Sequence, residues 1–116
     1  MDIKVGEYVR TKLGKIDKVK NNNYYMQQYI ECEKGLYLRD NITKHSANIT
    51  DLIEVGDYVN GRLVLAVDYK KQNICLLIPL NDTKANTNIM WYGYEDIKTI
   101  LTHEQFEANC YKTDIN

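Results

Sequence analysis

The sequence has few of the residues that build catalytic and metal centres. It contains two histidines and three cysteines, and neither type is paired at the spacing of a zinc site. The sequence shows no set of a nucleophile, a base and a third group to orient them, as a catalytic site would need. Gly6 and Gly56 are isolated, so they do not indicate a phosphate-binding loop. We therefore expect a protein with no catalytic activity, no resident metal and no cofactor.

Long apolar stretches are absent as well. The longest, ICLLIPL at residues 74–80, is far shorter than the roughly 20 residues that a membrane-spanning helix needs. The opening MDIKVGEYVR lacks the apolar region of a signal peptide, and an odd number of widely spaced cysteines does not indicate a disulfide framework. These features predict a cytoplasmic protein that does not enter a membrane.

An excess of positive charge is also missing. The net charge is −1 at pH 7, whereas nucleic-acid-binding domains are strongly basic because they neutralise phosphates. Only the first hairpin is basic, and it carries four lysines that could bind nucleic acid: Lys12, Lys15, Lys18 and Lys20. Lysines at sheet edges also prevent edge-to-edge association, which is the simpler interpretation of these residues.

A repetition dominates what the sequence does contain. IKVGEYV at residues 3–9 and IEVGDYV at residues 53–59 share five identical residues at an offset of fifty, with Glu7 answered by Asp57. We therefore expect two units, residues 1–52 and residues 53–116. Each is small enough to be marginally stable alone, so the units are expected to pack together.

Alternating apolar residues and turn signals predict mainly strands. The expected strands cover residues 4–12, 15–19, 24–33 and 36–40, and then 55–61, 62–69, 74–80 and 89–95. The run 62–69 is apolar almost throughout and is expected to be buried on both faces. Asn60-Gly61 is a tight-turn dipeptide, and residues 21–23 are expected to form a polar turn.

Little helix is predicted. Residues 41–53 are expected to hold at most one turn of 3₁₀ helix. A short C-terminal helix should begin after Thr102, which can cap it, with Gln105 at the position of a capping box.

Short strands, tight turns and little helix are typical of a small barrel or sandwich. The opening VG(E/D)YV strand, followed by a hairpin and a short Asp-Ile segment, resembles the SH3-like barrel. We predict an all-β chain with a short C-terminal helix, built as two tandem SH3-like barrels that pack together. A single distorted barrel with a long insertion is the alternative.

The chain also resembles small proteins encoded by phages and prophages of low-GC Gram-positive bacteria. The resemblance rests on residues 4–19, 42–61 and 95–107. It implies a provenance, and it assigns no activity or catalytic residue. Small phage proteins without enzymatic motifs are frequently factors that act on the host or on its defences, so the resemblance favours a protein-binding inhibitor.

Aromatic residues supply the candidate binding surface. The chain has ten tyrosines and one tryptophan, types that are enriched at interface hot spots. The candidate partner-binding residues are Tyr25, Tyr29, Trp91, Tyr92 and Tyr94. Tyr92 and Tyr94 share one face of the expected strand and Trp91 lies on the other, so one of these faces must be core.

The remaining polar candidates are expected to be solvated. His45 and His103 have no partner at ligand spacing, so both are interpreted as surface residues. Glu54 and Asp57 are close in sequence, but the counterpart of Glu54 in the first unit is Lys4, of opposite charge. Because the charge at this position is reversed between the two units, the simpler interpretation of Glu54 and Asp57 is a solvated turn.

We therefore expect a non-catalytic, phage-encoded protein that docks on a host protein. In its sharpest form it inhibits a host defence nuclease, as anti-CRISPR proteins do. Two alternatives remain open: a nucleic-acid-binding accessory module that uses the basic hairpin, and a nucleotide-binding sponge.

Overall fold

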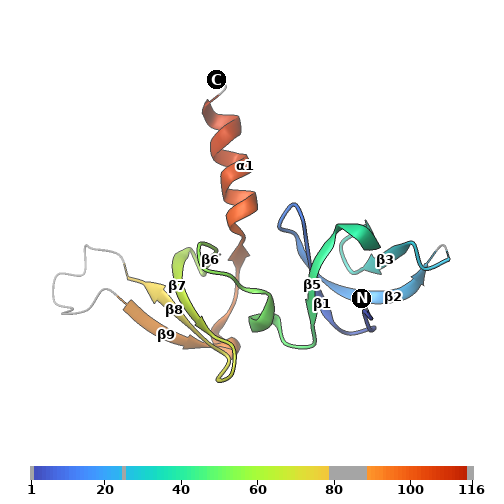
Figure 1. Cartoon of the computed structure of the whole chain (residues 1–116). Coiled ribbons are helices and arrows are strands. Elements are labelled where there is room, and N and C mark those ends of the chain that lie inside the picture. The colour runs from blue at the N-terminus through green and yellow to red at the C-terminus, as the bar shows by residue number, and fades with distance from the viewer. Residues whose placement is uncertain (1, 25, 79–88, 115–116) are drawn as a thin grey trace. The chain divides into compact units, whose positions relative to one another are not determined.

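The computed structural model describes residues 2–24, 26–78 and 89–114. The chain divides into two compact units, Met1–Leu52 and Ile53–Asn116. Among these described residues, each unit contains one five-stranded antiparallel sheet, and a single α-helix follows the second sheet (Figure 1). The prediction of a mostly β chain with a short C-terminal helix is therefore confirmed.

The first unit is a meander whose last strand returns to the first. Its elements are β1 (Tyr8–Thr11), β2 (Ile16–Tyr24), β3 (Tyr29–Cys32), β4 (Leu36–Leu38), the 3₁₀ helix η1 (Arg39–Asn41), β5 (Ile42–Ser46) and the 3₁₀ helix η2 (Ile49–Leu52). The sheet order is β4-β3-β2-β1-β5. The short helix η1 therefore leads the chain from one edge of the sheet to the other.

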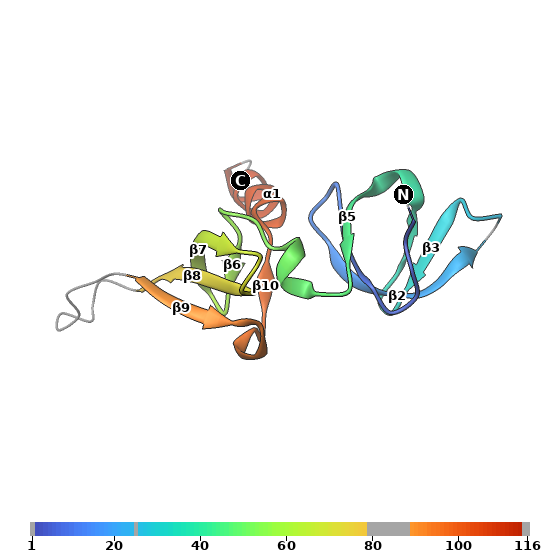
Figure 2. The same cartoon turned by 60° about the horizontal axis from the view of Figure 1, so that its bottom comes forward.

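The second unit repeats this topology. Its elements are β6 (Tyr58–Val59), β7 (Arg62–Asp68), β8 (Asn73–Leu77), β9 (Ile89–Gly93), the 3₁₀ helix η3 (Tyr94–Asp96), β10 (Ile100–Leu101) and α1 (His103–Asp114). The sheet order is β10-β6-β7-β8-β9, and β10 pairs with β6 as β5 pairs with β1 (Figure 2). Among the described strands no ladder joins the two ends of either sheet, so both sheets are open and closed barrels are not formed.

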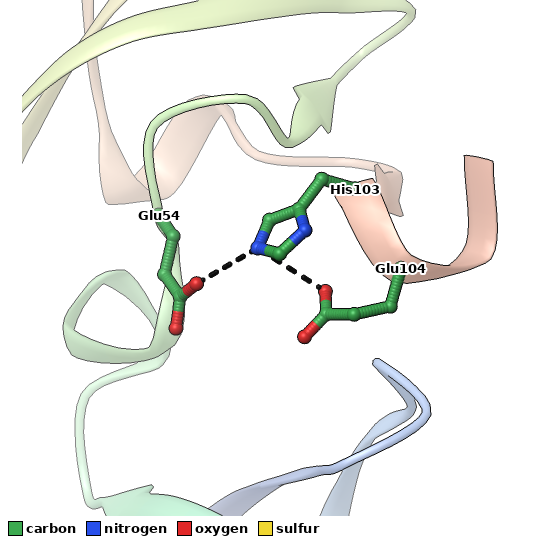
Figure 3. Close-up of side chains that lie close together, drawn as sticks. All are labelled: Glu54, His103 and Glu104. Carbon is green, nitrogen blue, oxygen red and sulfur yellow. Dashed lines mark hydrogen bonds and ion pairs between the residues drawn. The ribbon is translucent and has the colours of Figure 1, made fainter. Parts of the chain in front are cut away.

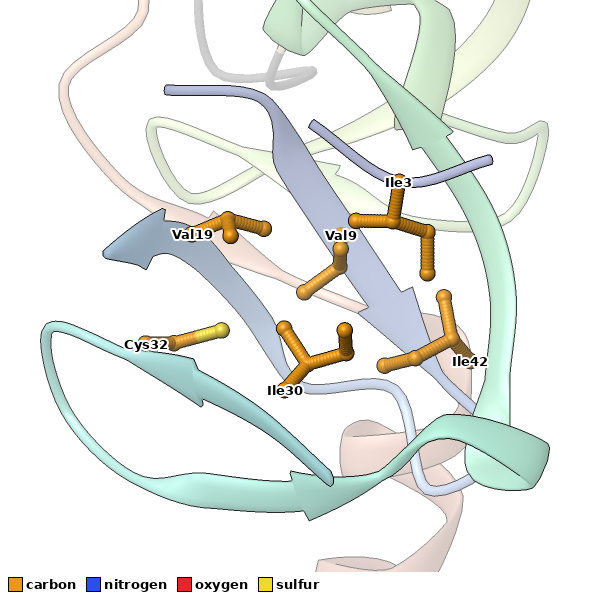
Figure 4. Packing of buried hydrophobic residues seen from close by; sticks show 6 residues of the cluster. All are labelled: Ile3, Val9, Val19, Ile30, Cys32 and Ile42. Atoms are coloured by element: carbon orange, nitrogen blue, oxygen red, sulfur yellow. The ribbon is translucent and has the colours of Figure 1, made fainter. Parts of the chain in front are cut away.

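Each unit has its own apolar core. In the first, Ile3 from the N-terminal segment packs with side chains that come from four strands (Figure 4). The members of this core are Ile3, Val9, Val19, Ile30, Cys32 and Ile42, with Tyr37 packed against them. The second core consists of Ile53, Val59, Val64, Ile74 and Leu76.

The repeated motif folds in the same way in both units. Gly6 and Gly56 adopt φ values of 91° and 98°, a region that favours glycine. Their amides donate to the carbonyls of Val19 and Val64 at 2.9 and 3.1 Å, which ties the turn to the second strand of each sheet. The recurrence of VG(E/D)YV thus corresponds to one local structure that is built twice.

Several expected boundaries were wrong in the first unit. The polar run at residues 21–23 lies inside β2, which continues to Tyr24. The chain reverses later, where Met26 and Gln27 have φ values of 59° and 67°. Residues 42–46 form strand β5, although their sequence has no clear strand pattern. They are a strand because they pair with β1.

In the second unit, the expectation that residues 62–69 are buried on both faces was wrong. Only Val64 is buried in β7, and Leu65 is 38% exposed beside an irregularity in the pairing with β8. The tight turn at Asn60-Gly61 is confirmed: both residues have positive φ, at 54° and 78°, and they join β6 to β7.

No helix in the described ranges is long and apolar enough to span a bilayer.

Candidate functional site

The register of β8 and β9 decides which aromatic side chains of the second unit face the core. Tyr92 lies opposite the buried Ile74 and packs against the core, and its hydroxyl accepts a hydrogen bond from Arg62 Nη1 at 3.1 Å. Trp91 lies opposite Cys75, on the other face, and is 52% exposed. Tyr92 therefore has a core role, whereas Trp91 is available for contact.

The other aromatic candidates fall in different places. Tyr94 lies in η3 and is exposed. Tyr29 is half-buried in β3 of the first unit, where it pairs with Leu38 of β4 and Tyr24 of β2. Tyr25 lies outside the described residues.

An apolar surface surrounds Trp91 at the edge of the second sheet. Leu77 of β8 and Ile89 of β9 lie opposite each other on the same face as Trp91. Met90 lies between Ile89 and Trp91 along β9 and is on the other face, opposite Leu76. Exposed fractions are 38% for Leu77, 44% for Ile89 and 41% for Met90. We call these four residues the β9 edge. This group of four residues was not predicted from the sequence. A signal was present, because edge strands usually carry charged residues or proline, and residues 89–93 contain neither.

The four lysines of the basic hairpin have different surroundings. Lys12 and Lys15 line a hollow of about 460 Å³ together with Leu13 and Leu36. Lys18 lines a different hollow and its ammonium lies 5.8 Å from the centre of the Tyr8 ring. Lys20 Nζ lies 3.8 Å from Glu31 Oε2. Their charge is thus divided between two hollows and one surface ion pair.

A histidine–carboxylate pair stabilises the repeated turn of the first unit. His45 Nδ1 lies 3.0 Å from Glu7 Oε1, which also accepts the backbone N–H of Lys4 at 2.7 Å. Burial alone would raise the pKa of Glu7, but the Lys4 amide and His45 outweigh it, so this pKa lies below its ordinary value of 4.5. The neighbouring Ser46 hydroxyl donates to Asp51 instead, at 2.6 Å, so His45 and Ser46 have different partners.

The second unit has a larger cluster at the equivalent turn. His103 Nε2 lies 2.9 Å from Glu54 Oε1 and 3.4 Å from Glu104 Oε1 (Figure 3). The three side chains are each between one quarter and one third exposed. The expectation that His103 and Glu54 are simply solvated was wrong, because the fold brings together residues that are 49 positions apart.

A buried carboxylate positions this cluster. Asp57 has no exposed surface, and its Oδ2 accepts the backbone N–H of Glu54 at 2.8 Å. Its Oδ1 accepts the backbone N–H of His103 at 2.9 Å. Asp57 therefore connects the repeated turn with the first residue of α1.

The start of α1 is the part of the site that the sequence predicted best. The amide of Gln105 donates to Thr102 Oγ1 at 3.4 Å, and the Thr102 amide donates to Gln105 Oε1 at 3.2 Å. This reciprocal pair is the expected capping box. One turn further, Phe106 packs on Tyr58 with ring centres 4.9 Å apart.

Comparison of the chain with models of protein families, with curated proteins and with solved structures finds no significant match.

Proposed function

We propose that this chain is a non-catalytic binding protein that docks on another protein through the β9 edge. The observation that carries the proposal is three consecutive large apolar residues, Ile89, Met90 and Trp91, each more than 40% exposed on the last strand of a sheet. Tryptophan is one of the residue types that are enriched at interface hot spots.

The expected mode of contact is addition of an extended strand from the partner. One side of β9 has no strand neighbour among the described residues, so its backbone groups can accept another strand. Natural edges are usually protected by charge, proline or a bulge, and β9 has neither charge nor proline. An apolar edge without this protection is typical of a surface that is covered by a partner.

The fold supports a finer proposal, that each unit is an SH3-like domain. In both units a four-strand meander is followed by a 3₁₀ helix and a last strand that pairs with the first. The VG(E/D)YV openings lie at the same place in both sheets. This is the order expected of SH3-like domains, here with open sheets.

The sharpest form of the proposal rests on the sequence resemblance to phage proteins. On that basis the chain acts in the cytoplasm of a bacterial host, and its partner is a host protein such as a CRISPR–Cas or other defence nuclease. Nucleic-acid binding by the basic hairpin is less favoured, since only Lys12 and Lys15 line a common hollow. A nucleotide-binding sponge is the third candidate.

The proposal is tested by an affinity pull-down of the tagged chain from host lysate, with and without nuclease treatment. Replacement of Trp91 by lysine places a charge on the β9 edge, and we expect it to abolish capture of the partner. The matched control is Leu13→Lys, because Leu13 is 76% exposed in the first unit and its replacement leaves the β9 edge unchanged. Circular dichroism verifies that both variants fold.

Retention of the same host protein by the original chain and by Leu13→Lys, but not by Trp91→Lys, supports docking through β9. Loss of all partners after nuclease treatment contradicts it and favours the nucleic-acid alternative, whose affinity should fall steeply with salt. Co-purification of an ultraviolet-absorbing small molecule with the chain would favour the sponge.

A further inference from the structure

Three potential metal ligands converge at the start of α1 in the second unit. Glu54 comes from the repeated turn before β6, and His103 and Glu104 are the first two residues of the helix. One ligand atom from each lies within 4.8 Å of the other two. Figure 3 shows both carboxylates directed at the same imidazole nitrogen. We propose that Glu54, His103 and Glu104 bind a divalent cation of the zinc type.

The spacing of the three atoms suits such an ion. Zinc binds imidazole nitrogen and carboxylate oxygen at about 2.0–2.2 Å in tetrahedral geometry, which separates neighbouring ligand atoms by about 3.4 Å. His103 Nε2 lies 3.4 Å from Glu104 Oε1 and 2.9 Å from Glu54 Oε1. Three corners of the tetrahedron require Glu54 Oε1 to move away from His103 Nε2 by about half an ångström. They also require the two carboxylate oxygens, which lie within 4.8 Å of each other, to reach the same spacing of about 3.4 Å. The partial exposure of all three side chains leaves the fourth corner open to water.

The first unit contains a natural comparison. It has a histidine–carboxylate pair at its copy of the turn, His45 with Glu7 at 3.0 Å, but Glu7 corresponds to Asp57 rather than to Glu54. There the position that corresponds to Glu54 is occupied by Lys4, whose positive charge opposes a cation. The exchange of Lys4 for Glu54 between the repeats therefore places a possible ligand in the second unit where the first unit has a cation. A ligand role for Glu54 would give this change of charge a chemical reason.

The elements around the cluster are suited to hold the ligands in place. Asp57 fixes the backbone of both Glu54 and His103 through two hydrogen bonds, and the capping box fixes the first turn of α1. The two carboxylates contribute a charge of −2, which exceeds the half-unit positive charge of a helix N-terminus, so the net charge at the site attracts a cation. A bound ion would connect the turn before β6 to α1, and it requires no partner protein. This inference is therefore independent of docking through the β9 edge.

The test is titration of the chain with Zn²⁺ by calorimetry and with Co²⁺ by visible absorption. Cysteine thiolates also bind zinc, and Cys110 lies on the same helix, so all proteins carry the Cys110→Ser replacement. We expect one ion per chain and a Co²⁺ spectrum typical of four-coordinate nitrogen and oxygen ligation, without a thiolate charge-transfer band. Glu104→Gln keeps the shape of the side chain and should weaken binding at least tenfold, as should Glu54→Gln.

The control is His45→Gln, which removes the histidine of the His45–Glu7 pair in the first unit and should leave the affinity unchanged. Circular dichroism shows whether each variant retains its fold. Absence of zinc binding up to millimolar concentration overturns the proposal, as does equal affinity in Glu104→Gln and the original chain. Weakening by His45→Gln as large as that by Glu104→Gln also overturns it, because binding would not depend on the three-residue cluster.

Discussion

Replacement of Asp57 by asparagine should destabilise the second unit by about 2 kcal/mol. The carboxylate is fully buried and accepts the backbone N–H groups of Glu54 and His103 on its two oxygens, at 2.8 and 2.9 Å. Hydrogen bonds to charged groups contribute roughly 1.5–3 kcal/mol each. Asparagine can accept only one of the two bonds and places its own N–H₂ group against the other donor, so about one such bond is lost.

Alanine at the same position removes both bonds and leaves two buried donors, so Asp57→Ala should cost about 3–6 kcal/mol. The corresponding replacement in the first unit, Glu7→Ala, should cost less, about 1–2 kcal/mol, because part of that carboxylate is exposed and water can replace it. The difference between the two units therefore measures the effect of burial on the same repeated turn.

The assay is urea denaturation, followed by tryptophan fluorescence for the second unit and by circular dichroism for the first. Trp91 is the only tryptophan of the chain and lies in the second unit, so its emission reports unfolding of that unit. Asp96→Asn is the control, since Asp96 is exposed in η3 and its replacement should change the free energy of unfolding by less than about 0.5 kcal/mol. A loss in Asp57→Asn no larger than that in Asp96→Asn would refute the reasoning.

Three further predictions concern the turn of the second unit and the pH dependence of the first. Asn60 has φ 54° and bonds three backbone groups between residues 96 and 99, so Asn60→Ala should cost about 2 kcal/mol in the same urea assay. Asn60→Gly tolerates the positive φ and should cost less, and equal losses would exclude a contribution from backbone strain. Burial, with nearby carboxylates, raises the pKa of Cys32 from 9.0 to about 12, and burial with Asp17 raises the pKa of Tyr37 from 10.0 to about 12. Both raised values favour the neutral forms in the fold, so the first unit should lose stability as pH rises from 9 to 12, and Cys32→Ala should reduce that loss in circular dichroism. The lowered pKa of Glu7 has the opposite sign: its contribution is present above pH 4.5 and is lost as the pH falls below it. Glu7→Gln should therefore flatten the acid limb of the stability profile, and an unchanged limb would show that Glu7 does not contribute to it.

The local features of the fold could be predicted from the sequence because their causes are local. Asn60-Gly61 predicts a tight turn, since both residues tolerate positive φ. Thr102 and Gln105 predict the start of α1, since the capping box is formed by residues three positions apart. The repeated motif at an offset of fifty likewise corresponds to the same turn in both units.

Strand boundaries were less predictable where pairing decides them. Residues 42–46 become β5 because they lie beside β1, and Ile100–Leu101 becomes β10 because it lies beside β6. Neither segment has a pattern that distinguishes it from a loop. The hydrogen bonds that define these strands are supplied by residues far away in the chain.

The amino-acid sequence by itself determined a mostly β chain, its tight turns, its helix start and the recurrence of one motif. Only the tertiary structure decided which side of β9 is core, because register with β8 places Tyr92 inward and Trp91 outward. It also decided that His103 lies beside Glu54, across 49 positions of sequence. Local patterns depend on neighbouring residues, whereas a site depends on which distant segments the core brings together.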